Sequence, residues 1–175
     1  SAMISACSTA LGLGRMLHMN VVTAGGMTGN LETDVGLKFQ MAKELLADHS
    51  FVAVHFKGTD VAAHDRKPME KMRFLERFDT QLGVFLDSVN DVRIVVSADH
   101  GTSSRTGNHL PDPVPLMVTD WHATSEKEIQ DAIEFDEEHA SDGLFGTLVP
   151  SQLFDLLHPT GSRLGQTALQ ADPEA

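Results

Sequence analysis

The chain has 175 residues, of which 41% are hydrophobic and 14 are glycine, an apolar content typical of a globular domain rather than a disordered polymer. Thirteen Lys and Arg against 25 Asp and Glu give a net charge of −12, which argues against binding to nucleic acid. No apolar run approaches the roughly 20 residues that cross a bilayer, so no membrane association is expected. The single cysteine, Cys7, has no partner for an intramolecular disulfide, which favours a reducing compartment and predicts a cytoplasmic protein.

The first half of the chain alternates helical and extended patterns. Residues 1–3 are interpreted as a cloning remnant, so the fold is expected to start at Ile4. Small and apolar residues at helical spacing predict a helix within 5–19, and the β-branched run 20–23 predicts a strand that enters a glycine-rich turn. Asp34 precedes an amphipathic helix that ends near Leu46. The continuous apolar run 51–56 predicts a strand covered on both faces.

The second half continues this alternation. Residues 69–86 keep a helical period, 93–97 form the next predicted strand, and 113–118 predict a shorter strand whose prolines place its start at a sheet edge. A last helix is expected over 151–157. Strands that alternate with helices predict an α/β fold of three layers, α/β/α, around a mostly parallel sheet. One domain is expected over 4–158, with 159–175 as a flexible tail.

Polar side chains follow the two long apolar runs, where the strands are predicted to end. Asp60 and His64 follow the first run, Asp99 and His100 follow the second, and His109 comes nine residues later. Open α/β sheets bind ligands at the carboxyl ends of their strands. Carboxylate and imidazole without thiolate suit zinc or manganese, and residues four apart share one face of a helix. Five such ligands would crowd one ion, so two divalent ions are the better interpretation.

Other features have plainer interpretations. A lone Asp-xxx-His arises often by chance, and the combination of pairs at two strand ends carries the metal hypothesis. The glycine-rich segment 25–29 lacks the spacing of a phosphate-binding loop and is interpreted as a turn. The acidic residues within 134–138 are interpreted as solvated surface. The remaining histidines are expected to be exposed, or satisfied within the core in the case of His55: His18, His49, His55, His122, His139 and His158.

Three segments in order resemble the archaeal-type cofactor-independent, or 2,3-bisphosphoglycerate-independent, phosphoglycerate mutases of the alkaline phosphatase superfamily. They are VHFKGTDVAAHD at 54–65, SADHGT at 97–102 and HLPDPVP at 109–115. The resemblance extends over about residues 4–158. It implies an alkaline phosphatase-like fold that is incomplete here, because the family continues upstream of the first resembling segment. This chain is therefore interpreted as a C-terminal fragment.

The resemblance also implies roles for the motif residues. Asp60, His64 and His109 would hold one manganese or zinc ion, and Asp99 with His100 would help to hold a second. The family interconverts 3-phosphoglycerate and 2-phosphoglycerate through a phosphoserine, with the metals activating the serine and stabilising the leaving alkoxide. The nucleophilic serine and a further aspartate ligand lie upstream in the family. The fragment is thus expected to hold no catalytic nucleophile and to be inactive alone.

One local departure keeps alternatives open. Ser103 and Ser104 stand where the family commonly has a proline after the threonine, and they are interpreted as hydrogen-bonding loop residues rather than nucleophiles. A metal-dependent phosphatase, a phosphonate-pathway relative and a non-catalytic truncated metal-binding module remain alternatives. The expected partner is a phosphorylated small-molecule substrate. A parallel sheet that lacks its N-terminal strands exposes an edge, so self-association or pairing with the missing N-terminal part is also expected.

Overall fold

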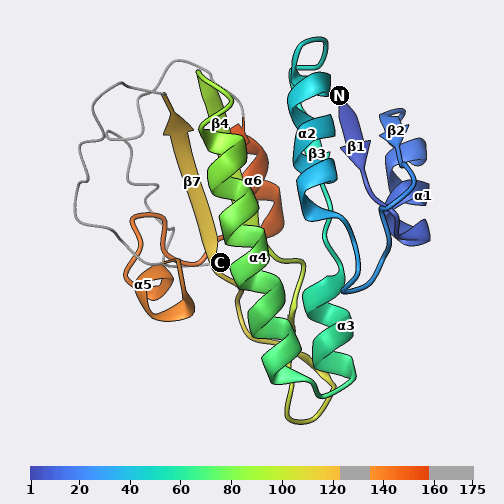
Figure 1. Ribbon diagram of the computed structural model, residues 1–175. Helices are drawn as coiled ribbons and strands as arrows, with labels where there is room; N and C mark the ends of the chain where they lie inside the picture. The colour runs from blue at the N-terminus through green and yellow to red at the C-terminus, as the bar shows by residue number, and fades with distance from the viewer. Residues whose placement is uncertain (123–134, 158–175) are drawn as a thin grey trace. The chain divides into compact units, whose positions relative to one another are not determined.

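The computed structural model describes residues 1–122 and 135–157 and has the predicted α/β class (Figure 1). These residues form two compact units, one of Ser1–Asn90 with Gly101–Leu110, and another that takes in Asp91–His100 and the described residues from Pro111 onward. The predicted tail, together with His158 and Glu134, lies outside the described residues. No helix within the described parts of the chain is long and apolar enough to cross a membrane.

The first unit contains a parallel sheet with the strand order β2-β1-β3. Its strands are three residues each: β1 (Ala2–Ile4), β2 (Asn20–Val22) and β3 (Val52–Val54). Ala2 and Met3, which were set aside on sequence grounds, belong to the central strand, where Met3 pairs with Val21 on one side and Ala53 on the other. This corrects the expected start of the fold, because Ala2 is 0% exposed and its amide donates to the carbonyl of Phe51.

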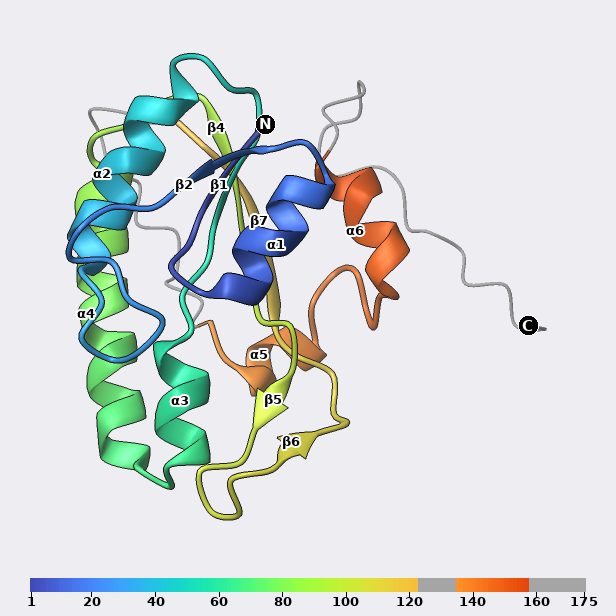
Figure 2. The same ribbon diagram turned by 90° about the vertical axis from the view of Figure 1, so that its right-hand side faces the viewer.

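Two helices cover opposite faces of this sheet (Figures 1 and 2). Helix α1 (Ser8–Met16) leads from β1 to β2, and α2 (Val35–Leu46) leads back past β1 to β3. Because both crossovers are right-handed by default and run in opposite directions along the sheet, the two helices fall on opposite faces. The predicted start of α2 after Asp34 is confirmed, and the Asp34 carboxylate caps the helix by accepting the amide of Leu37 at 2.8 Å.

The core continues into the next two helices, α3 (Gly58–His64) and α4 (Pro68–Leu86). Helix α4 packs against both α2 and α3. A Cβ on Gly58 would lie 2.4 Å from the Phe74 ring, so the glycine lets α3 begin directly against α4. The predicted apolar face of α4 is confirmed by an aromatic cluster with ring centroids 5.1–5.5 Å apart, which consists of Phe39, Phe56, Phe78 and Phe85.

A short hairpin completes the first unit. Its strands, β5 (Gly101–Thr102) and β6 (His109–Leu110), are antiparallel, and β5 packs against α3 (Figure 2). The intervening loop closes through the amide of Ser103 on the carbonyl of Asn108 and the amide of Gly107 on the carbonyl of Ser103. Hairpin and helix are far apart in the sequence, and their contact brings two of the predicted motifs together.

The second unit is built on β4 (Val92–Ser97) and β7 (Leu116–Trp121), which pair antiparallel. Parallel pairing needs a crossover, usually a helix, and the segment between these strands has none. Strand β7 begins after the last of the prolines within 111–115, which lack the amide that a ladder requires. Two short helices follow, α5 (Glu137–Ser141) and α6 (Pro150–Leu157), the latter as predicted.

Candidate metal centre

Helix α3 presents two of the predicted ligands on one face. Asp60 and His64 are four residues apart, so one helical turn brings their side chains together, with His64 Nε2 3.2 Å from Asp60 Oδ1. The Asp60 side chain is only 16% exposed, whereas that of His64 is 43% exposed. The pair therefore has a sheltered carboxylate beside an accessible imidazole.

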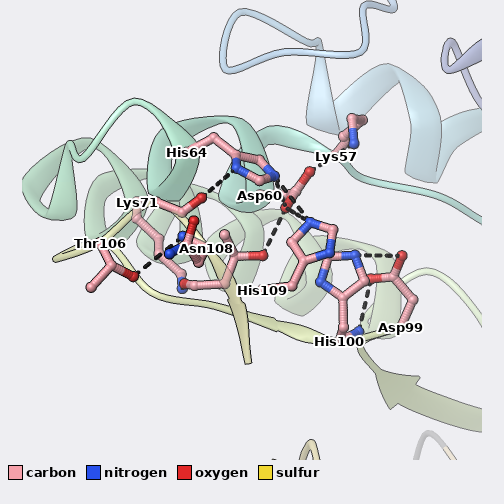
Figure 3. A network of polar contacts seen from close by, with 11 residues as sticks. Lys57, Asp60, His64, Lys71, Asp99, His100, Thr106, Asn108 and His109 are labelled. Atoms are coloured by element: carbon pink, nitrogen blue, oxygen red, sulfur yellow. Dashed lines mark hydrogen bonds and ion pairs between the residues drawn. The ribbon is translucent and has the colours of Figure 1, made fainter. Parts of the chain in front are cut away.

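The β5–β6 hairpin supplies the third ligand. His109 Nε2 lies 3.1 Å from His64 Nε2 and 3.9 Å from Asp60 Oδ1, and Figure 3 shows both rings directed toward the carboxylate. These three atoms form the group of potential metal ligands within the described residues. Helix and hairpin thus bring together Asp60, His64 and His109, as the sequence motifs predicted.

The arrangement fits a divalent ion. Ligand atoms about 2.1 Å from a tetrahedral zinc ion lie about 3.4 Å from each other, and the three distances here, 3.1, 3.2 and 3.9 Å, bracket that value. Burial would raise the pKa of the Asp60 carboxyl, but hydrogen bonds from Lys57 and Thr102, with the nearby charges of Lys57 and His64, outweigh it and hold that pKa below its usual range. Asp60 is therefore ionised at neutral pH, the form that binds metal.

Three contacts around these ligands were not anticipated as specific pairs. Lys57 Nζ donates to Asp60 Oδ2 at 2.7 Å, and Thr102 Oγ1 donates to Asp60 Oδ1 at 2.8 Å. His64 Nδ1 contacts the Gly107 carbonyl at 2.7 Å. The position of Thr102, directly after the Asp99 motif and its glycine, was a usable signal for the second contact. A backbone carbonyl such as that of Gly107 leaves no side-chain signature in a sequence.

The other predicted pair lies in the second unit. The amide of His100 donates to Asp99 Oδ1 at 3.0 Å, and His100 Nε2 is 3.4 Å from Asp99 Oδ2. The Asp99 side chain is 82% exposed. Three of the five predicted ligands are thus brought together in the first unit, while Asp99 and His100 contact each other at the end of β4 (Figure 3).

Several plainer interpretations also agree with the structure. His55 Nδ1 lies 3.0 Å from the buried hydroxyl of Ser5, so its ring has the expected partner, although His55 itself is only partly buried. Ser103 Oγ accepts the amides of Arg105 and Thr106, which is the predicted loop role.

Comparisons with known proteins identify the family to which this chain belongs. The chain matches the Metalloenzyme superfamily over residues 8–156. It is 34% identical to a 2,3-bisphosphoglycerate-independent phosphoglycerate mutase of Methanopyrus kandleri over 93% of this chain and 38% of the relative, and 36% identical to one of Pyrococcus horikoshii over 85% and 35%. A solved structure of a P. horikoshii protein matches with a TM-score of 0.78 and 34% identity, covering 89% of this chain and 42% of that one. The chain spans little more than a third of the length of these curated relatives.

Proposed function

Because the chain belongs to the Metalloenzyme superfamily, we propose that Asp60, His64 and His109 bind a divalent cation, manganese or zinc. The observation that supports this most directly is the triangle of one carboxylate oxygen and two imidazole nitrogens, with sides of 3.1, 3.2 and 3.9 Å. Three protein ligands leave coordination positions open, as catalytic rather than structural sites do.

We extend the proposal to a longer protein that contains this chain as its C-terminal part. There the chain serves a phosphoglycerate mutase that interconverts 3-phosphoglycerate and 2-phosphoglycerate through a phosphoserine, in keeping with the name of its relatives. The nucleophilic serine is contributed from outside this chain, and Asp99 with His100 contribute to a second ion. Bound divalent ions supply charge neutralisation for a phosphoryl group and activation of the nucleophile.

The proposed site is preorganised by contacts among residues of this chain. Asp60 is kept ionised by its hydrogen bonds to Lys57 and Thr102, so cation binding does not have to displace a proton from it. The Gly107 carbonyl can only accept, so Nδ1 of His64 carries the proton and, in the neutral ring, Nε2 has a free lone pair. These contacts orient a carboxylate and an imidazole toward one point at low conformational cost.

Calorimetric titration of Mn²⁺ and Zn²⁺ into the metal-free chain tests the site. The wild-type chain should bind, and a His64→Ala and His109→Ala double variant should lose that binding. A double variant with His49→Ala and His122→Ala is the matched control, because it removes two histidines whose contacts, with the Leu45 carbonyl and Asp91, lie outside the site. Equal binding by the wild type and the first double variant would refute the ligand assignment.

The activity is tested on the full-length protein. Conversion of 3-phosphoglycerate to 2-phosphoglycerate, lost in the His64→Ala and His109→Ala variant, supports the mutase. Release of inorganic phosphate without that conversion would instead favour the related phosphatase. Turnover by the present chain alone would contradict a nucleophile outside it.

A further inference from the structure

The β5–β6 hairpin touches every member of the proposed ligand set. It contributes His109 from β6, the Thr102 hydroxyl on Asp60 from β5, and the Gly107 carbonyl on His64 from its loop. Thr102 pairs with His109 across the hairpin, so the residue that holds Asp60 lies directly opposite the third ligand. One ten-residue segment, Gly101–Leu110, therefore connects to all three ligands.

Gly107 is fitted to this role by its backbone. Its φ of +77° is in the region that L side chains rarely adopt, and a Cβ there would lie 3.0 Å from the carbonyl oxygen of His64. The glycine thus allows the loop to approach α3 closely enough for its own carbonyl to reach His64 Nδ1 at 2.7 Å. The carbonyl can only accept, so this contact at 2.7 Å favours a proton on Nδ1 over one on Nε2, which lies farther from its own acceptor, 3.2 Å from Asp60 Oδ1. This leaves Nε2 as the ligand atom.

Thr102 orients the Asp60 carboxylate, as the Gly107 carbonyl orients the His64 ring. Thr102 is 6% exposed. Its hydroxyl donates a hydrogen bond of 2.8 Å to Asp60 Oδ1, the carboxylate oxygen nearest the two imidazoles. Lys57 takes Oδ2 at 2.7 Å, so the two donors fix the carboxylate plane from opposite oxygens. A carboxylate oxygen has two lone-pair sites, and the hydrogen bond from Thr102 leaves one of them on Oδ1.

We propose that the β5–β6 hairpin positions both ligands of α3, with Gly107 setting the tautomer of His64 and Thr102 setting the orientation of Asp60. This inference rests on the proposed metal site and deepens it. Gly107 and Thr102 are positioning residues, since neither is proposed to touch the ion. The loop and the helix then act as one preorganised unit for cation binding.

The tautomer of His64 gives a test that does not depend on metal. Long-range ¹H–¹⁵N correlation spectra of the metal-free chain, with His64 assigned from a His64→Ala sample, should show a protonated Nδ1 and an unprotonated Nε2 in the neutral ring. In Gly107→Ala this signature should be lost or mixed. The Nε2-protonated tautomer in the wild-type chain would overturn the proposal.

Metal affinity gives the second readout. Gly107→Ala should weaken Mn²⁺ and Zn²⁺ binding by about 10- to 100-fold, the range found when partners of metal-binding histidines are removed. Gly26→Ala is the matched control, because Gly26 also has a positive φ, +89°, but a Cβ there would meet only ordinary contacts at 3.7 Å. Unchanged affinity in Gly107→Ala, or an equal loss in Gly26→Ala, would contradict the positioning role.

Thr102 keeps the proposal falsifiable should Gly107→Ala fail to fold. Thr102→Val removes the hydroxyl at nearly constant volume and should weaken binding, whereas Thr102→Ser keeps the donor and should restore most of it. Equal affinities in the two variants would show that packing alone matters. If the wild-type chain binds no metal at all, the proposed function fails, while the His64 tautomer still decides whether the hairpin positions the imidazole.

Discussion

The two units of the chain bury their side chains to different degrees. All hydrophobic residues below 9% exposure among the described residues belong to the first unit: Ala2, Ile4, Met27, Val35, Phe39, Ala42, Ala62, Ala63, Phe74 and Phe85. In the second unit the apolar residues of β4 are only partly buried, although the strand has the sequence of a buried one. The contrast shows that a β-branched run and a close-packed environment are separate properties.

The proposed ligands of the two units also differ in how firmly the surrounding structure holds them. Ala62 and Ala63, on α3 between Asp60 and His64, are 0% exposed and fix that helix in the core of the first unit. Asp99, which ends the corresponding run in the second unit, has a side chain that is 82% exposed. A metal site gains affinity when its ligands are held in place before binding. The first group is thus better prepared to bind an ion in this chain than the second pair.

The largest expected effect comes from the same substitution made in both units. Ile4→Ala should cost about 2–5 kcal/mol of unfolding free energy, because Ile4 is 0% exposed and removing most of its side chain creates a cavity. Ile94→Ala in β4, which removes a partly buried side chain, should cost less than about 2 kcal/mol. Urea unfolding followed by circular dichroism measures both. Equal losses would show that the two strands are equally well packed in solution.

Substitutions of proposed ligands in the two units should also differ in their effect on metal affinity. Asp60→Asn should weaken the strongest Mn²⁺ or Zn²⁺ binding by more than about 100-fold, since loss of a ligand exceeds the 10- to 100-fold cost of losing an outer partner. Asp99→Asn should leave that binding event nearly unchanged in this chain. Calorimetry on both variants makes the comparison. A comparable loss in Asp99→Asn would mean that the tightest site uses residues of both units.

The sequence predicted which side chains of the candidate site lie together better than it predicted the topology. Each strand end is a local pattern, so Asp60, His64 and His109 could be selected from residues near apolar runs. Residues four apart lie close together on one face of a helix, and α3 provides that helix, although the sequence patterns predicted no helix over 58–64. The match between the predicted and observed bounds of α2 also has a local origin, because Asp34 gives a cap that is readable in the sequence.

Non-local features could not be read in this way. Strand β1 is three residues long and has no pattern of its own, and its central place depends on pairing with two distant strands. The antiparallel β4–β7 pair depends on how the chain returns, which the β-branched run at 92–97 does not encode. Lys38 has a side chain of a type that is usually exposed, yet it is 1% exposed here, and its amine donates to the carbonyl of His55 at 2.8 Å.

Lys38 should make the stability of the first unit depend on pH in the alkaline range. Burial lowers the pKa of its amine to about 8 in the folded chain, against 10.5 for an ordinary lysine. Between these values the unfolded chain binds a proton that the folded chain has lost, so unfolding free energy should rise with pH, by up to about 1.4 kcal/mol per unit. Urea unfolding at several pH values above about 8 measures this. Lys38→Met should abolish the rise, whereas Lys43→Met, at an exposed position of the same helix, should keep it.

The second unit should respond at acidic pH and more weakly. Asp120 accepts from Arg93 at 2.6 and 2.8 Å, and this pairing holds the pKa of Asp120 below 3.8. The pair therefore stabilises the fold above pH 3.8, and its contribution is lost as pH falls through the lower pKa of the folded state. Since the Asp120 side chain is 39% exposed, Asp120→Asn should cost less than about 1 kcal/mol near neutral pH. Asp112→Asn, at an exposed position of the same unit, is the control. The difference in unfolding free energy between Asp120→Asn and the wild type should vanish in acid. A difference that persists there would assign the effect to the packing of Arg93 rather than to its charge.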